Sequence, residues 1–285
     1  MRAAFTTLIL AILAILAFAG NSLLARAALA DGAIEAGAYS AIRLAAGALI
    51  LLPFLGRRLA LSDMPGALSL AVYVAGFSLA YLSLGAGIGA LILFACVQVT
   101  ILVIGFVRGE RLTGLGWTGL ALAFGGLVLL LAPGQSGAAE TVPWLPAALM
   151  AIAGVAWGAY TVIGRASPDA TGQTARNFLI AALLVAPMLA LDSGLPGWNG
   201  AFLAVLSGTL TSAIGYVLWY MVTPRLGLAS VACVQLGTPV VAALGGVVLL
   251  SESAGWRLVA GGAIILGGIL LTLIKPKPSV DAVKS

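Results

Sequence analysis

Long apolar stretches follow one another along the whole chain, separated by short segments rich in glycine, proline and charged residues. A helix that crosses the hydrocarbon core of a bilayer needs about 20 mostly apolar residues. The pattern therefore predicts an all-α integral membrane protein with ten transmembrane helices, followed at 275–285 by a polar tail that we expect to be disordered and cytoplasmic. The ten predicted spans are 5–24, 36–55, 65–83, 87–107, 114–132, 143–164, 173–191, 200–221, 229–250 and 254–274.

Composition supports this interpretation and adds the bilayer as a partner. Hydrophobic residues make up 62% of the 285 residues and charged residues only 8%, with a mean hydropathy of +1.15. Soluble domains carry about 25% charged residues, because their surfaces face water. The net charge of +5 does not indicate a nucleic acid partner, since in a membrane protein the location of the basic residues matters more than their sum.

The basic residues predict the orientation. Only Arg26, Arg43 and Arg257 fall on or near the outer side if the N-terminus is cytoplasmic. Cytoplasmic segments of membrane proteins carry the excess of arginine and lysine, so we expect a multi-pass protein of the bacterial inner membrane with both termini in the cytoplasm. The basic residues on the inner side are then Arg2, Arg57, Arg58, Arg108, Arg111, Arg165, Arg176, Arg225, Lys275, Lys277 and Lys284.

Two segments resemble each other and indicate an internal duplication. Ala17–Arg26 and Ala156–Arg165 share alanine, an aromatic residue, a hydroxyl residue and arginine at matching positions. Five spans per unit is an odd number, so the second unit is inverted relative to the first, as in many secondary transporters. We therefore predict two inverted five-helix repeats, 1–137 and 138–274, around a central cavity. Further matching pairs are Arg43 with Asn177, Pro53 with Pro187, Glu110 with Glu252, and Gly119 with Gly261.

Aromatic and polar residues inside the spans are the candidates for substrate binding. Trp157, Tyr160 and Thr161 share one helix face, and for Trp157 we favour cavity lining over the interfacial belt. Tyr216 and Trp219 share a stripe of the eighth span, where cavity and belt positions are equally open for Trp219. The other candidates are Asn21, Ser78, Tyr81, Gln98 and Gln235. Polar groups are costly in lipid and should face the interior, although bonding between helices is the alternative.

Arg43 is the only charged residue well inside a span. It could bind a carboxylate, or pair with a partner such as Glu35 or with backbone carbonyls; we favour a structural or gating role. Pro239 removes a backbone hydrogen bond in mid-span and could supply a gating kink. No carboxylate lies in mid-span, which favours facilitated transport or exchange over proton coupling, though Glu110 or Glu252 could titrate. The gating or structural candidates are thus Arg43, Asn177, Pro239, Glu110 and Glu252.

The chain has no histidine, which excludes zinc centres with histidine ligands and Ser-His or Cys-His catalysis. We expect no enzyme, no catalytic residue, no metal site and no cofactor. Cys96 and Cys233 lie in separate apolar stretches and are interpreted as small buried hydrophobes rather than a disulfide. The 37 glycines are spread through the spans, where packing within one chain is favoured over dimer contacts; we expect a monomer.

The spans, the repeat and two motifs resemble the EamA-like branch of the drug/metabolite transporter superfamily, most closely its YddG-type aromatic amino-acid exporters. The motifs are Trp-Gly-x-x-x-Val-x-x-Arg at 157–165 and Pro239 placed thirteen residues before Glu252. The resemblance implies a basket of ten helices, outward export of neutral or aromatic amino acids, and cavity-lining roles for Trp157, Tyr160, Tyr81 and Gln98. In the first half, Phe18 and Val97 stand where the family pattern has tryptophan and proline.

The leading hypothesis is an exporter of small neutral or aromatic amino acids and related metabolites, working by alternating access as a facilitator or exchanger. A nucleotide-sugar or organic-phosphate carrier would need two or more basic residues in the cavity. A proton-coupled drug exporter is a further alternative. An intramembrane enzyme lacks the usual constellations, and a lipid-binding or scaffold protein predicts no polar cavity.

Overall fold

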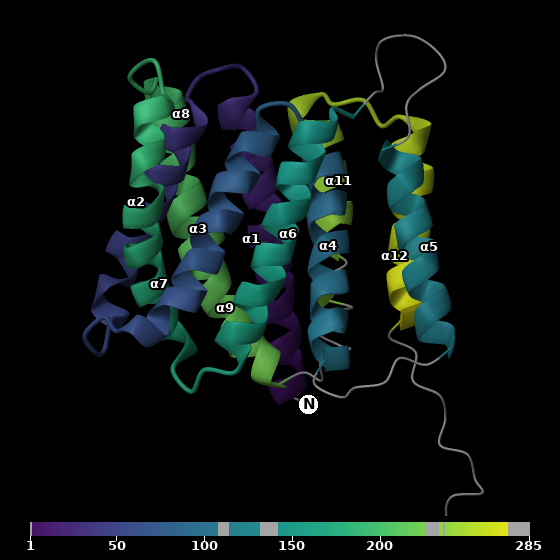
Figure 1. Cartoon of the computed structure of the whole chain (residues 1–285), viewed down its shortest axis with the longest axis horizontal. Coiled ribbons are helices and arrows are strands. Elements are labelled where there is room, and N and C mark those ends of the chain that lie inside the picture. The colour runs from purple at the N-terminus through teal and green to yellow at the C-terminus, as the bar shows by residue number, and fades with distance from the viewer. Residues whose placement is uncertain (1, 108–113, 132–141, 226–233, 236, 273–285) are drawn as a thin grey trace, which may run out of the picture.

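The computed structural model describes residues 2–107, 114–131, 142–225, 234–235 and 237–272, whose regular structure is entirely helical. The prediction of an all-helical chain is confirmed. Seven helices are long and apolar enough to cross a membrane, and three shorter apolar helices lie at Gly114–Leu129, Gly237–Leu250 and Trp256–Leu271. Neighbouring helices run in alternating directions (Figure 1). The main helices are α1 (Arg2–Leu29), α2 (Ala36–Leu51), α3 (Met64–Tyr81), α4 (Ala86–Val107), α5 (Gly114–Leu131), α6 (Trp144–Arg165), α7 (Ala170–Val185), α8 (Trp198–Leu206), α9 (Gly215–Val222), α11 (Gly237–Leu250) and α12 (Trp256–Thr272).

Two prolines set the ends of α2 and α7. Each helix continues into a tighter 3₁₀ segment, η1 (Leu52–Phe54) after α2 and η3 (Ala186–Leu191) after α7, with proline near the start of that segment. Proline has no N–H to donate to the preceding turn, so a regular α-helix does not continue through it. Pro53 and Pro187 thus end α2 and α7 in the same way.

The eighth predicted span is one continuous helical rod with a wider centre. Between α8 and α9 the chain follows a π-helix, η4 (Ser207–Ile214), and the rod then closes with a 3₁₀ turn, η5 (Thr223–Arg225). π-Helical turns are rare and occur frequently at functional sites. Ser207 and Thr211 of η4 bond Asn21 on α1, and Ser212 bonds Arg43 on α2, the two helices that are the main neighbours of η4.

The helices form one large bundle and one outlying pair. In the bundle α3 packs on α6 and α7, while α1 and α2 pack on the α8–η4–α9 rod; α2 also contacts α7, and α4 contacts α6 and α11. The helices α5 and α12 contact mainly each other and lie beside the bundle (Figure 1). Their backbones approach closely at Gly126 and Gly268, where an added methyl group would meet Gly261 and Ala123, consistent with glycines serving packing within the chain.

The bundle has two ends that matter below. We call the end where α1 begins the near end, and the end where α1 leads into α2 the far end (Figure 1). Large apolar side chains are exposed along the outside of the long helices, as expected for a surface that faces hydrocarbon. The polar side chains described below are instead enclosed between the helices.

Candidate functional site

An aromatic cluster fills the centre of the bundle. Its hub is Trp157 on α6, which is 2% exposed. The Trp157 ring lies 4.6 Å from the ring of Tyr216, 5.0 Å from Tyr73, 5.5 Å from Tyr160 and 5.6 Å from Phe18, measured between ring centroids. These contacts join α1, α3, α6 and α9. The whole aromatic cluster consists of Phe18, Tyr73, Phe77, Tyr81, Trp157, Tyr160, Phe178, Tyr216, Trp219 and Tyr220.

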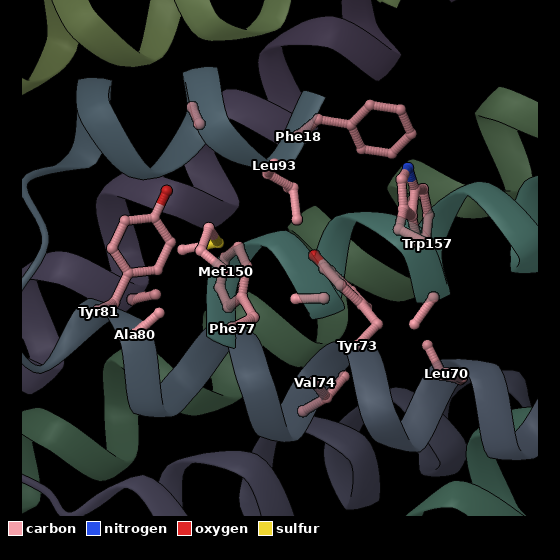
Figure 2. Packing of buried hydrophobic residues seen from close by; sticks show 14 of the residues in the cluster. Phe18, Leu70, Tyr73, Val74, Phe77, Ala80, Tyr81, Leu93, Met150 and Trp157 are labelled. Carbon is pink, nitrogen blue, oxygen red and sulfur yellow. The ribbon is translucent and has the colours of Figure 1, made fainter. Parts of the chain in front are cut away.

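A small cavity lies within this cluster. Figure 2 shows the rings of Tyr73, Phe77 and Tyr81 projecting from one side of α3, the side on which Phe18, Leu93 and Trp157 also lie. About 10 Å³ is open to the centre of a water molecule, which is room for about one water. The structure is therefore an occluded form, in which a larger molecule has no room at the centre. Its lining is Phe18, Asn21, Ser22, Tyr73, Phe77, Leu93, Phe94 and Trp157.

Arg43 of α2 lies behind this wall and is fully buried. Its Nε donates to Ser212 Oγ at 3.0 Å, and its Nη2 donates at 3.2 Å to the hydroxyls of Tyr73 and Tyr216. Its guanidinium also lies 5.2 Å and 4.9 Å from the ring centres of Tyr73 and Phe77, within cation–π range. The remaining nitrogen, Nη1, has no hydrogen-bond partner among the residues that the structure describes.

Asn21 extends the polar network from Arg43 to α1. Its Nδ2 donates to Tyr73 Oη at 3.0 Å, while its Oδ1 accepts from Ser207 Oγ at 2.6 Å and Thr211 Oγ1 at 3.3 Å. Ser207 and Thr211, like Ser212, belong to η4, so the π-helical segment supplies hydroxyls to both Asn21 and Arg43. We call Asn21, Arg43, Tyr73, Ser212 and Tyr216 the central polar network.

Glycine allows α2 to reach this position. A side chain at Gly208 of η4 would overlap the backbone carbonyl of Arg43, and one at Gly47 of α2 would overlap the ring of Phe178. Small residues at such crossings let membrane helices approach backbone to backbone. The close crossing brings the guanidinium of Arg43 within reach of Ser212 on the neighbouring rod.

An ion pair closes the far end between α1 and the turn from α11 to α12. Arg26 Nε lies 3.2 Å from Glu252 Oε1, and Arg26 Nη1 also donates to the carbonyl of Tyr81 at 3.3 Å. Glu252 in turn accepts from the backbone N–H of Ala86 at 2.9 and 3.0 Å, the first residue of α4. A carboxylate there is favoured by the helix dipole. We call Arg26, Glu252 and Ala86 the far-end closure.

Two further carboxylates at the far end bind the start of α2 and the turn after α7. Asp192 accepts from the N–H groups of Gly37 (3.1 Å) and Ala38 (2.6 Å). Glu35 accepts from Ser193, at 2.7 Å from its hydroxyl and 2.9 Å from its N–H. These hydrogen bonds, the hydroxyl first, lower the pKa of Glu35 below its ordinary value, because they favour the ionised carboxylate.

A buried carboxylate closes the near end between α3 and α7. Asp63 is 1% exposed and binds two arginines: both Arg57 Nη atoms, at 2.6 and 3.1 Å, and Arg176 Nε at 3.2 Å. Arg176 also contacts Asp169, at 3.4 Å, in the turn before α7. We call Asp63, Arg57 and Arg176 the near-end closure. A polar cavity of about 490 Å³ opens beside it.

The structure brings some of the predicted site residues together. Trp157, Tyr160, Tyr216 and Trp219 all belong to the aromatic cluster, and Trp219 is fully buried. Asn21 belongs to the central polar network. The Arg43 guanidinium bonds hydroxyls, whereas Glu35, a pairing partner considered from sequence, bonds Ser193 instead.

Other predicted residues are bonded locally. Thr161 and Ser78 donate to carbonyls one turn back in their own helices, and Ser78 also accepts from Ser40. The Tyr81 hydroxyl donates to the carbonyl of Ala86 at 3.3 Å. Their side-chain hydroxyls are thus used within or between helices.

The last predicted residues lie on or next to α4, α7 and α11. Gln98 is buried on α4, and Asn177 on α7 packs against Gly66. Gln235 is buried, and neither of its side-chain polar atoms bonds a residue within the described part of the chain. Pro239 lies in the first turn of α11, and the described helix continues from it without interruption. Glu110 lies outside the described residues.

Sequence reasoning did not single out Phe18, Tyr73 or Asp63 as site residues. Tyr73 and Phe18 stand in apolar spans. In such a span the sequence pattern is the same whether an aromatic ring faces lipid or the centre of the protein. The eight-residue spacing of Tyr73 and Tyr81, with Phe77 midway, places all three on one face of α3 and was the available signal. Asp63 stands in a polar connection, which favours an exposed position.

An apolar helical bundle, closed at both ends around an enclosed aromatic and polar centre, is the architecture of a multi-pass membrane transporter. Residues 144–274 match the EamA-like transporter family. An uncharacterized protein of Pseudomonas aeruginosa is 47% identical over 274 residues, which cover 94% of each chain. The chain belongs to the EamA-like transporter family.

More distant relatives agree with this assignment. An uncharacterized transporter of Archaeoglobus fulgidus is 25% identical over 232 residues, covering 78% of this chain and 82% of its own length. A protein of known crystal structure is similar with a TM-score of 0.66 at 20% identity, covering 93% of this chain and 96% of that chain. The latter similarity shows a shared fold.

Proposed function

We propose that this transporter moves small neutral or aromatic amino acids outward across the bacterial inner membrane, as a facilitator or exchanger. The observation that carries the proposal is the enclosed aromatic cluster around Trp157, bordered by the central polar network. Aromatic rings suit an apolar or aromatic side chain, and a few convergent polar groups suit its ammonium and carboxylate. Trp157, Tyr160, Tyr73 and Tyr216 are the proposed contacts.

We further propose that the two halves, 1–137 and 138–274, are inverted five-helix repeats that exchange between two arrangements. Helix contacts support this, because most occur in pairs related by exchanging the halves. The contact of α3 with α6 corresponds to that of the α8–η4–α9 rod with α1. The contact of α4 with α6 corresponds to that of α11 with α1. Breaking the far-end or the near-end closure would open the centre to one side at a time.

The proposed orientation places the near end in the cytoplasm. Arg57, Arg58, Arg165, Arg176 and Arg225 lie at that end of the described helices, while Asp31, Glu35, Asp192 and Glu252 lie at the far end. An excess of basic residues marks the cytoplasmic side.

An organic-phosphate or nucleotide-sugar substrate is less well supported. Phosphate recognition uses several basic side chains, and within the described residues Arg43 alone supplies a basic group to the central polar network. A proton-coupled mechanism would be supported by a carboxylate that pairs with Arg43 and could exchange a proton. None of the ion pairs between described residues includes Arg43.

Counterflow in proteoliposomes tests the proposal. Vesicles preloaded with phenylalanine, methionine or threonine should accumulate the radiolabelled amino acid faster than empty vesicles. Trp157→Ala and Tyr216→Ala, at two of the proposed contacts, should reduce the rate, while Trp144→Ala, at a tryptophan that is 78% exposed, should not. Absence of counterflow for all three amino acids with folded, inserted protein would refute the proposal.

A further inference from the structure

We propose that Arg43 binds the carboxylate of the transported molecule through Nη1, with help from the hydroxyl of Tyr73. The inference rests on the proposed function and deepens it, because it names the substrate group that the site requires. It assigns Arg43 to substrate binding, whereas sequence reasoning favoured a gating or structural role.

Among the described residues, no carboxylate forms an ion pair with Arg43. Its side chain is fully buried, and its three hydrogen bonds go to the neutral hydroxyls of Ser212, Tyr73 and Tyr216. None of the ion pairs between described residues includes it. Buried arginines in membrane proteins ordinarily pair with an acid or mark a ligand pathway. The partner that the proposal assigns to this charge is an anionic group of the transported molecule.

The free nitrogen shows where this anion would bind. Nη1 is buried and has no hydrogen-bond partner among the described residues, while Nη2 and Nε are occupied. A guanidinium nitrogen presents N–H groups in a fixed plane, and carboxylate oxygens are strong acceptors for them. Tyr73 Oη already accepts from Asn21 and from Arg43, so its own O–H acts as a donor, to the neighbouring hydroxyl of Tyr216 or to a bound anion.

The position of Arg43 also connects the carboxylate to the aromatic wall. The guanidinium lies over the rings of Tyr73 and Phe77, and the same two residues line the central cavity with Trp157 and Phe18. When the carboxylate of a bound molecule contacts Arg43 beside the rings of Tyr73 and Phe77, the rest of that molecule lies against aromatic faces. This favours a monocarboxylate with an apolar or aromatic body.

A single negative charge fits better than a phosphate group. One guanidinium balances one carboxylate, and Asn177, which stands at the position of Arg43 in the second half, carries no charge. Phosphate carries up to two charges and is usually held by several basic groups. An amino acid and a simple carboxylic acid share the required group, so the experiment distinguishes them.

The experiment compares phenyl compounds as competitors of phenylalanine counterflow by the wild-type protein. L-Phenylalanine and 3-phenylpropionate keep the carboxylate; phenethylamine and L-phenylalaninamide lack it. We expect the two compounds without a carboxylate to compete at least about tenfold more weakly than phenylalanine, as for the loss of a charged hydrogen bond. If 3-phenylpropionate competes, a carboxylic acid is sufficient for binding. If phenylalanine competes and 3-phenylpropionate does not, binding needs the ammonium group as well as the carboxylate. Equal competition by phenethylamine, phenylalaninamide and phenylalanine would overturn the proposal.

A binding measurement separates this proposal from the proposed function. We expect L-phenylalanine or 3-phenylpropionate to raise the Tm of the purified wild-type protein and of Arg225→Gln, at an exposed arginine, but not that of Arg43→Gln. If vesicles show no counterflow, the proposed function fails and the Tm comparison alone decides the role of Arg43. If Arg43→Gln does not fold, the wild-type comparison of the carboxylates with phenethylamine decides it. Stabilisation by neither carboxylate, or equal stabilisation by phenethylamine, would overturn the proposal.

Discussion

Replacing Glu252 by glutamine should open the far end. The carboxylate bonds Arg26 at 3.2 Å and the N–H of Ala86 at 2.9 and 3.0 Å. Glutamine keeps the size of the side chain but removes its charge. The contacts hold α1, α4 and the turn from α11 to α12 together, so their weakening should favour a form that is open at the far end.

The magnitude follows from the two interactions that change. The side chains of Arg26 and Glu252 are 24% and 20% exposed, so loss of the ion pair costs about 1 kcal/mol. Weakening of the hydrogen bond and dipole interaction at the start of α4 costs about 1 kcal/mol more. A total of about 2 kcal/mol shifts the equilibrium between closed and open forms by about 30-fold.

A reporter cysteine measures this shift. Ser22 is buried and lines the central cavity, so we choose Ser22→Cys in a chain whose Cys96 and Cys233 are replaced by alanine. An impermeant maleimide added to intact cells should label this cysteine at least about tenfold faster when Glu252→Gln is also present. Labelling from the cytoplasmic side of inverted vesicles should not accelerate.

Glu35→Gln is the matched control, because Glu35 lies at the same end but bonds Ser193 and not the far-end closure. It should leave the labelling rate unchanged. The reasoning is refuted if Glu252→Gln labels at the wild-type rate, or if Glu35→Gln accelerates labelling to the same extent.

Four further predictions concern stability and transport. Trp157→Phe should weaken phenylalanine transport about tenfold, through the loss of ring contacts worth about 0.5–1.5 kcal/mol each, whereas Trp144→Phe should not; equal rates in counterflow would contradict this. Gly208→Ala should lower the Tm by several degrees, because the added methyl group would overlap the backbone carbonyl of Arg43. Gly125→Ala should leave the Tm unchanged, because an added methyl group there has no neighbour within 4 Å. A wild-type Tm for Gly208→Ala would show that the two helices can move apart at this crossing without loss of stability. Asp63→Asn should destabilise the protein by about 3 kcal/mol, since the buried Arg176 loses its buried carboxylate and keeps only the exposed Asp169 at 3.4 Å, whereas Asp31→Asn, at an exposed residue, should not; this is checked by denaturation in detergent. Because the pKa of Glu35 is lowered on folding, its contact with Ser193 stabilises the protein fully above the ordinary pKa of 4.5, and this stabilisation is lost as the pH falls through the lowered pKa. The Tm difference between wild type and Glu35→Gln should therefore be constant from about pH 6 to 8 and shrink below about pH 4.5. A Tm difference that shrinks between about pH 8 and about pH 6 would contradict this prediction.

Local sequence was sufficient for the helices and for one wall of the site. Apolar stretches of about 20 residues predict membrane helices without knowledge of their neighbours, and Trp157 with Tyr160 share a face because of helical spacing alone. Trp219 was harder. Its position near the end of an apolar stretch fits the interfacial belt as well as the centre, and only the contact with Phe18 of α1 decides between them.

The partners of Arg43 could not be predicted, because they depend on how distant helices cross. Ser212 and Tyr216 follow Arg43 by 169 and 173 residues, and the π-helical segment that contains Ser212 has no distinctive sequence. Asp63 was missed for a related reason: a polar connection is normally exposed, but here Arg176 from the second half folds over it.

The crossing at Arg43 has a consequence for biosynthesis. The ribosome delivers α2 to the membrane long before η4 and α9 exist, and in that interval Tyr73 is the hydrogen-bond partner of Arg43 already in the same half. An arginine at the centre of an isolated membrane helix costs about 2.5–3.5 kcal/mol on insertion scales. The early chain therefore carries an incompletely satisfied charge, whose remaining known partners arrive only with the second half. The hydrogen bonds of Arg43 to Ser212 and Tyr216 can therefore form only after the later part of the chain has been inserted.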